Sequence, residues 1–152
     1  MAAMRRNLDI NYRKYFKAAV CAPAVLLPAL LLVDAMYFSP ALQGGWEQYL
    51  QIYVLGFGIA ACWAFVPFAW RRIDRKSAPE VLRLAWLAPL IFVPFYAVPW
   101  VVYGLAYLAT GRVAGLGIML SWLAYLPYVL VVAYLCSAAS VWGYRMIAKC
   151  TA

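Results

Sequence analysis

The feature that most constrains this chain is the length of its uncharged stretches. Asp, Glu, Lys and Arg are all absent from residues 18–33, 48–70, 84–111 and 113–144. A bilayer core about 30 Å thick is crossed by about 20 helical residues. Three of the stretches meet that length, and the first does so if its polar flanks lie at the interfaces. The sequence therefore predicts an all-α fold, a bundle of four transmembrane helices over residues 16–37, 48–70, 84–110 and 114–144.

Composition leaves no room for a second, soluble domain. Of the 152 residues, 68% are hydrophobic and only 12% are charged, which lies outside the range of soluble globular domains. The longest connections, residues 34–48 and 71–83, are too short to bury a core of their own. Residues 1–152 are predicted to form a single integral membrane domain. The first apolar run is interrupted by Pro23 and Pro28 and lacks a clear cleavage site, so we expect a retained helix rather than a signal peptide.

The basic residues lie almost entirely on one side of the predicted membrane. The chain has 13 Lys and Arg residues against 5 acids, and only Arg112 falls on the opposite side if four helices cross. Lys and Arg are retained in the cytoplasm during insertion. We therefore expect a multi-pass protein of the bacterial cell inner membrane, with both termini and the 71–83 loop cytoplasmic. The net charge of +8 then reflects topology and attraction to anionic lipids at the cytoplasmic rim, and not nucleic-acid binding.

Residues that would carry chemistry are missing from the predicted spans. The chain has no histidine and no CxxC, and none of its five acids lies at the centre of a span. Acid–base catalysis, metal binding and ion transport all depend on such groups. We predict no catalytic residue, no cofactor site and no metal site, and we expect that the protein is not an enzyme. The four cysteines are interpreted as small packing residues.

Three small residues recur at a spacing of four in the second span, namely Gly56, Ala60 and Ala64. This spacing places them on one helical face, where small side chains let two helices approach closely in lipid. The face is a candidate helix-packing surface, and contact within the bundle is favoured over a dimer contact.

The third and fourth spans carry clear boundary signals and several prolines. Ser77 and Glu80 match a capping box, so the third helix is expected to begin at Ala78. The glycine in the turn before Arg112 predicts an antiparallel hairpin of the last two helices. Prolines inside a helix remove a hydrogen bond and crowd the preceding turn. The candidate kinks are Pro89, Pro94, Pro99 and Pro127. Static bends are favoured over hinges at the first three, and the long fourth span either kinks at Pro127, tilts or extends into the cytoplasm.

Several short motifs resemble a known family. Residues 68–73 (FAWRRI), 79–83 (PEVLR) and 87–90 (LAPL) resemble the same region of immunity proteins of the colicin A type, with weaker similarity at 110–112 (TGR) and 11–14 (NYRK). The resemblance implies an inner-membrane protein of four helices that protects the cell from a pore-forming bacteriocin. The partner would be the toxin's pore-forming domain, whose hydrophobic hairpin is bound within the bilayer. Polar groups at the outer rim are then candidate partner-binding residues: Asp34, Glu47 and Arg112.

Two other functions stay open on the sequence alone. One is a small accessory or assembly subunit of a larger membrane complex, and the other is a holin-like pore-former. The oligomeric state, whether a homo-oligomer or a hetero-oligomer, is also open.

Overall fold

The computed structural model describes the backbone of residues 2–37 and 50–150, and this part of the chain is helical with no strand. A π-helical segment, Leu50–Leu55, leads into the second of the long helices. Each of the four long helices is long and apolar enough to cross a membrane, as in a multi-pass membrane protein. They are α1 (Ala2–Tyr37), α3 (Gly56–Asp74), α4 (Ala78–Ala109) and α5 (Ala114–Cys150).

All four long helices extend beyond the predicted spans. α4 begins at Ala78, before residue 84, and α5 ends at Cys150, after residue 144. α1 is helical from Ala2, well before the predicted start of the first span at residue 16. α3 continues past Trp70 to Asp74. Helix propagation adds one hydrogen bond per residue once a helix exists, which favours such extensions, and basic residues suit the C-terminal end of the α3 dipole. The predicted start of the second span at residue 48 lies outside the described residues.

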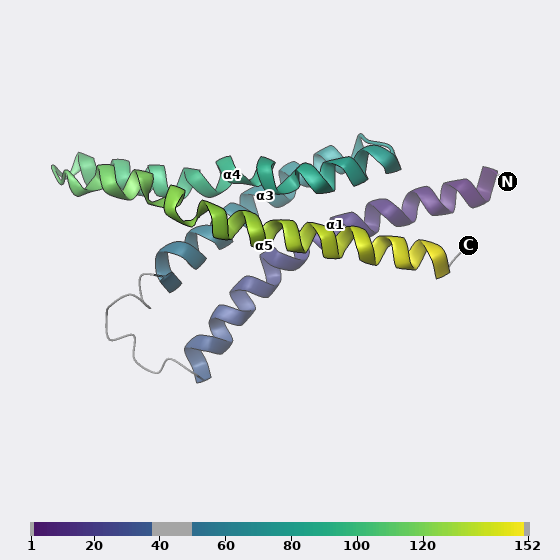
Figure 1. The fold of residues 1–152 in the computed structure, drawn as a ribbon, viewed down its shortest axis with the longest axis horizontal. Helices are drawn as coiled ribbons and strands as arrows, with labels where there is room; N and C mark the ends of the chain where they lie inside the picture. Colours follow the sequence, from purple (N-terminus) through teal and green to yellow (C-terminus); the bar gives the residue numbers. More distant parts are fainter. Residues whose placement is uncertain (1, 38–49, 151–152) are drawn as a thin grey trace.

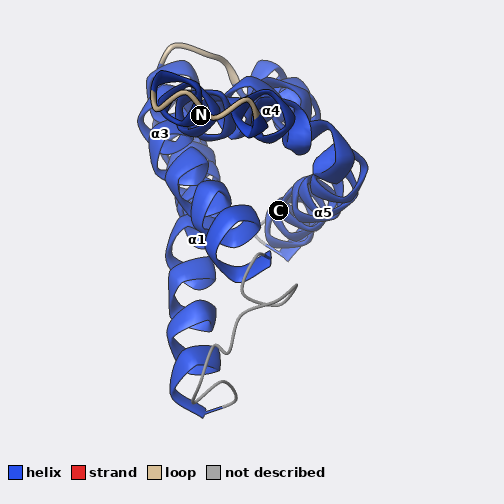
Figure 2. Cartoon of the chain, turned by 90° about the vertical axis from the view of Figure 1, so that its left-hand side faces the viewer, coloured by secondary structure: helices blue, strands red, loops and turns tan. Residues whose placement is uncertain are grey.

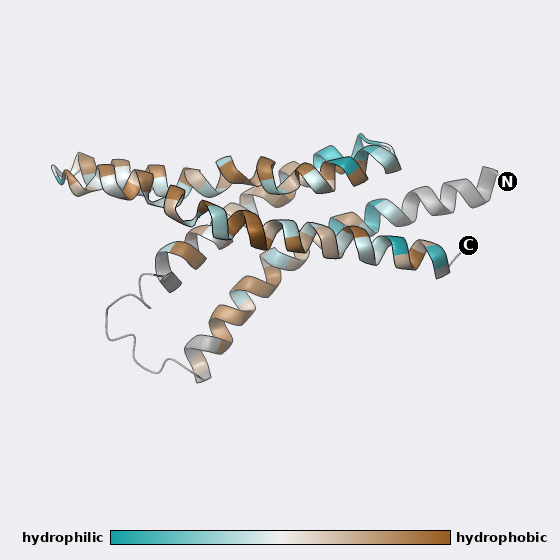
Figure 3. Cartoon of the chain, in the orientation of Figure 1, coloured by the Kyte–Doolittle hydropathy of each residue, from teal (hydrophilic) through white to brown (hydrophobic). Residues whose placement is uncertain are grey.

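Both ends of the chain and the α3–α4 turn lie at one end of the molecule (Figure 1). Hydrophilic residues gather there (Figure 3), including Arg71 and Lys149. We call it the basic end. The α4–α5 turn, with Arg112, lies at the opposite end, which we call the Arg112 end. The sidedness of these two ends in a membrane stays a prediction.

The boundary signals of α4 are confirmed. The Ser77 backbone N–H donates to Glu80 Oε2 at 2.9 Å, and α4 begins at the next residue with Pro79 in its first turn. Gly111 ends the helix with φ of 78°, a left-handed conformation that glycine adopts without steric cost. α5 then returns antiparallel along α4, and this pair forms the most extensive helix contact of the described chain.

The prolines do not interrupt the helices in which they lie. α4 is continuous across Pro89, Pro94 and Pro99, and α5 is continuous across Pro127. Part-way along its length α5 diverges from α4 toward the basic end (Figure 1). The assignment of kinks to these four prolines stays a prediction.

The closest approach of two helices is made by glycines that the spacing argument missed. Gly104 and Gly115 are buried where α4 meets α5. A Cβ atom on Gly115 would lie 2.5 Å from the Gly104 carbonyl oxygen and 2.9 Å from the Leu108 backbone nitrogen. The backbones therefore touch here, as small residues permit in lipid.

The expected packing face on α3 is not used inside the bundle. Ala60 and Ala64 are both exposed, so the interpretation of Gly56, Ala60 and Ala64 as an intramolecular contact is wrong. α3 turns a different face inward, with Ala61, Ala69 and Ile73 buried. The spacing of small residues identifies a smooth helical face but not the neighbour that covers it.

Candidate functional site

An apolar groove of about 260 Å³ lies between the helices, and we call it the central groove. All four long helices line it. Viewed along the bundle, α3 and α4 lie together, and α1 and α5 lie below them (Figure 2). α1 and α5 touch far less than α4 and α5 do. Representative lining residues are Pro23 on α1, Gly58 on α3, Phe92 on α4 and Ala133 on α5.

The size of the central groove sets what can enter it. A cavity of about 150 Å³ holds a benzene-sized ligand, whereas a helix with its side chains is about 10 Å across. A groove of 260 Å³ therefore accepts one or two large apolar side chains, and a partner helix would lie along its mouth. Gly58 contributes to the space, because a Cβ atom on it would meet no heavy atom within 4 Å.

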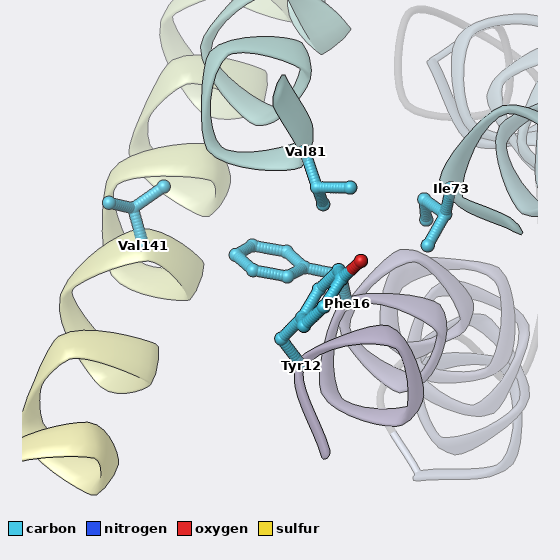
Figure 4. Close-up of a cluster of buried hydrophobic side chains, with 5 residues drawn as sticks. All are labelled: Tyr12, Phe16, Ile73, Val81 and Val141. Carbon is cyan, nitrogen blue, oxygen red and sulfur yellow. The ribbon is translucent and has the colours of Figure 1, made fainter. Parts of the chain in front are cut away.

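Aromatic residues of α1 close the groove at the basic end. Tyr12 and Phe16 are 2% and 3% exposed. They pack among three aliphatic side chains from α3, α4 and α5 (Figure 4), which are Ile73, Val81 and Val141. We call these five residues the basic-end cluster.

Hydrogen bonds fix the same part of α1 to its neighbours. The Tyr12 hydroxyl donates to the Lys76 carbonyl oxygen at 2.9 Å, and the Tyr15 hydroxyl donates to the Ser140 carbonyl oxygen at 2.9 Å. A Cβ atom on Gly143 would lie 2.6 Å from the Tyr15 hydroxyl oxygen. The glycine therefore leaves room for this bond. α1 is thus tied to the α3–α4 turn and to α5 at once.

Toward the Arg112 end α1 leaves the bundle. The indole N–H of Trp63 donates to the Ala24 carbonyl oxygen at 3.0 Å. Beyond Ala24, no hydrogen bond or ion pair joins the described side chains of α1 to another helix. Leu30 and Met36 are 62% and 78% exposed. This divergence leaves the mouth of the groove open between α1 and α5.

α3 remains attached to α4 at that end, so the opening is due to α1. The Phe57 ring on α3 lies 5.7 Å from the Tyr103 ring on α4, measured between centroids. The Tyr53 hydroxyl, in the π-helical segment before α3, is 3.0 Å from the Tyr103 hydroxyl, and the Tyr103 and Tyr107 ring centroids are 5.1 Å apart. The Arg112 guanidinium lies 5.6 Å from the Tyr107 ring centroid. A row of aromatic rings therefore runs from α3 along α4 to the turn.

The lining of the central groove is mostly apolar and contains few reactive side chains. No charged residue lines it, and its polar side chains include two thiols and two hydroxyls, from Cys62, Cys136, Ser137 and Ser140. The Ser140 hydroxyl donates to the Cys136 carbonyl oxygen at 2.8 Å, an ordinary bond back to its own helix. The residues that the structure describes hold no group of three or more metal-ligating side chains. An apolar ligand would gain van der Waals contact here.

Of the three predicted rim residues, only Arg112 has a described side chain, and it does not line this groove. Arg112 is exposed in the α4–α5 turn, and the backbone of Asp34 lies near the end of α1. The Asp34 side chain and the whole of Glu47 lie outside the described residues. Partner binding by these three residues stays a prediction.

The groove itself was missed because it depends on the register of several helices. Gly58, Ala88 and Ala133 line it from three different helices. Each is an ordinary small residue within its own span, and no spacing in the sequence links them. Only the divergence of α1 and α5 turns these small side chains into an open space.

Comparisons with protein-family models, with curated proteins and with solved structures find no match. The functional argument therefore depends on the geometry of this chain.

Proposed function

We propose that this protein is a non-enzymatic immunity protein of the bacterial inner membrane. It would bind the hydrophobic helical hairpin of a pore-forming bacteriocin within the bilayer and so prevent the pore. The observation that carries the proposal is the central groove, which is apolar, open toward lipid between α1 and α5, and closed at the basic end. The similarity of three short motifs to colicin A-type immunity proteins supports the same function.

The proposed orientation matches the direction from which a toxin arrives. Positive residues favour a cytoplasmic basic end, so the divergent end of α1 would face the periplasm. A toxin hairpin that inserts from the periplasm would then meet the open side of the groove before it reaches the closed end. The basic-end cluster would limit how deeply it can enter.

Binding would occur by packing of helix against helix. In lipid there is no hydrophobic driving force between helices, so their association depends on van der Waals packing and on a few hydrogen bonds. One helix of the hairpin would lie along the mouth between α1 and α5 and insert one or two large side chains into the 260 Å³ space. The free α1 segment with Leu26 and Leu30, which are 58% and 62% exposed, would cover its outer side.

The direct test is protection of sensitive bacteria that express the chain. Cells are challenged with a panel of pore-forming bacteriocins, and survival with at least one toxin is the expected result. Gly58→Leu fills the groove and should abolish protection. Gly117→Leu is the matched control, because a Cβ atom there also meets nothing within 4 Å but Gly117 lies outside the groove. Membrane levels of both variants are compared by immunoblot.

The outcomes separate two claims. If no toxin is better tolerated, the immunity function is wrong. If Gly58→Leu protects as well as the unchanged chain, immunity stands and the groove is not the binding site.

Thiol chemistry provides a second readout of groove occupancy. Cys62 lines the groove from α3, so a variant that keeps only this cysteine reports on access to the space. Addition of the bound toxin should slow alkylation of Cys62 by a small membrane-permeant maleimide. A variant that keeps only Cys21, which does not line the groove, should react at an unchanged rate.

A second candidate function, an accessory subunit, is favoured by one observation. Ala60 and Ala64 form a small-residue surface on α3 that is exposed and that none of the described helices covers. In a larger complex a partner helix would cover it. A stoichiometric complex purified in mild detergent, and lost in Ala60→Leu, would support this function. Recovery of the chain alone would contradict it.

A further inference from the structure

A second, smaller hollow of about 40 Å³ lies near the basic end between α1, α3 and α4. We call it the α3–α4 cleft. Twelve residues line it, and Arg72 is the only charged one among them. Leu84 and Ile91 line it from α4, and the exposed Leu87 lies one turn from each along the same helix.

The guanidinium of Arg72 has no ionic partner within the described chain. It lies 5.1 Å from the Phe68 ring centroid, so its apolar stem follows the helix surface and its charge faces outward. Two acids of the α3–α4 turn region are engaged elsewhere. Asp74 pairs with Lys17 at 2.7 Å, and Glu80 accepts hydrogen bonds from Ser77.

The position of Arg72 along α3 corresponds to the depth of lipid head groups. Trp70 is 41% exposed, its indole N–H donates to the Lys17 carbonyl oxygen, and tryptophan prefers the membrane interface. A helix rises about 1.5 Å per residue, so Arg72 lies about 3 Å farther toward the basic end. With Trp70 at the membrane interface, Arg72 would be within reach of lipid phosphates.

We propose that the corner of α3 and α4 at the basic end is a binding site for an anionic phospholipid. Arg72 binds the phosphate, and one acyl chain runs down over Leu84, Leu87 and Ile91 with its upper methylenes at the α3–α4 cleft. The site combines an unpaired cation with an apolar furrow directly below it, which matches the polarity of a phospholipid from head to tail. This inference does not depend on the proposed immunity function.

A soluble phosphate would use only half of the site. Inorganic phosphate satisfies the charge of Arg72 but leaves the furrow uncovered. A zwitterionic phospholipid covers the furrow but offers less net charge. Strong binding therefore requires both parts in one molecule.

The experiment measures lipid binding to the purified full-length chain in detergent by native mass spectrometry. Phosphatidylglycerol and phosphatidylcholine with the same acyl chains are the two probes. Phosphatidylglycerol should bind more tightly, and Arg72→Gln should weaken it about fivefold, the change that corresponds to ~1 kcal/mol per cation near the surface. Arg71→Gln is the matched control, because Arg71 is the neighbouring exposed arginine and does not line the cleft.

Each outcome decides the proposal. The site is supported if Arg72→Gln alone weakens phosphatidylglycerol binding and if millimolar inorganic phosphate does not displace the lipid. If Arg72→Gln and Arg71→Gln weaken phosphatidylglycerol binding equally, the lipid is attracted diffusely to a basic surface, and the proposed site is wrong. Displacement by inorganic phosphate, or equal affinity for both lipids, also overturns it. The thermal unfolding midpoint of each variant shows that the fold is retained.

Discussion

The two halves of α1 pack in different ways. Tyr12, Tyr15 and Phe16 in the first half are held by a buried cluster and by hydrogen bonds to backbone carbonyls of two other segments. In the second half, Leu30 and Leu32 are 62% and 63% exposed, and no comparable cluster or hydrogen bond holds them among the described residues. The same helix therefore closes the bundle at the basic end and leaves it open toward the Arg112 end (Figure 1).

The difference shows what holds helices together in lipid. Leucine gains nothing by leaving hydrocarbon for a protein surface, so an apolar helix face alone does not bring it to its neighbours. Tyrosine supplies a ring that packs and a hydroxyl that needs a partner. α1 is attached where its sequence supplies such residues and diverges over residues 25–33, which are aliphatic apart from Pro28.

The largest loss of stability is expected for a substitution at Gly115, where α4 and α5 are tightly packed near the Arg112 end. Gly115→Ala would place a methyl group against the Gly104 carbonyl oxygen and the Leu108 backbone nitrogen. Backbone atoms cannot move aside as a flexible side chain can. We expect the free energy of unfolding, measured by detergent titration of helicity, to fall by about 3 kcal/mol.

Gly117→Ala, two residues along the same helix, is the control for Gly115→Ala. Its Cβ atom meets nothing within 4 Å, so stability should be unchanged or rise by a few tenths of a kcal/mol through better helix propensity. Equal effects of the two variants would mean that α4 and α5 are not in backbone contact.

The second prediction compares the stability effects of one substitution in each half of α1. Phe16→Ala removes a ring that is 3% exposed and leaves a cavity in the basic-end cluster. We expect a loss of about 2 kcal/mol, mainly from the cavity, since transfer from lipid contributes little. Leu30→Ala, at an exposed position of the same helix, should change stability by less than about 0.5 kcal/mol. A large effect of Leu30→Ala would show that the outer half of α1 packs on the bundle.

Much of the fold could be predicted from charge and apolar length. The uncharged stretches gave four helices of spanning length, and the Ser77–Glu80 bond and the left-handed Gly111 confirm the predicted ends of α4. These signals are local, since they depend on a few neighbouring residues. The turn at Gly111 also fixed the antiparallel pairing of α4 with α5.

The candidate groove could not be predicted, for a physical reason. In a soluble protein the polar face of a helix marks its outward side, but a spanning helix is apolar all round, so its sequence does not mark which face packs inward. The spacing of Gly56, Ala60 and Ala64 suggested one face of α3, and the bundle uses another. The Gly104–Gly115 contact and the space beside Gly58 depend on the register between helices.

The smallest effect tests whether polar bonds, and not aromatic packing alone, hold the first half of α1. Tyr15→Phe keeps the ring contacts with Phe16 and Tyr144 but removes the 2.9 Å bond to the Ser140 carbonyl oxygen. That oxygen still has the acceptor role of a helical carbonyl, so the expected loss is only about 1 kcal/mol. Tyr128→Phe, where the ring is 67% exposed, is the control and should have no measurable effect. If α1 separates from α5, alkylation of Cys136, which lines the groove near this bond, should also become faster in Tyr15→Phe alone. An unchanged alkylation rate together with unchanged stability would mean that ring packing is sufficient to close the basic end.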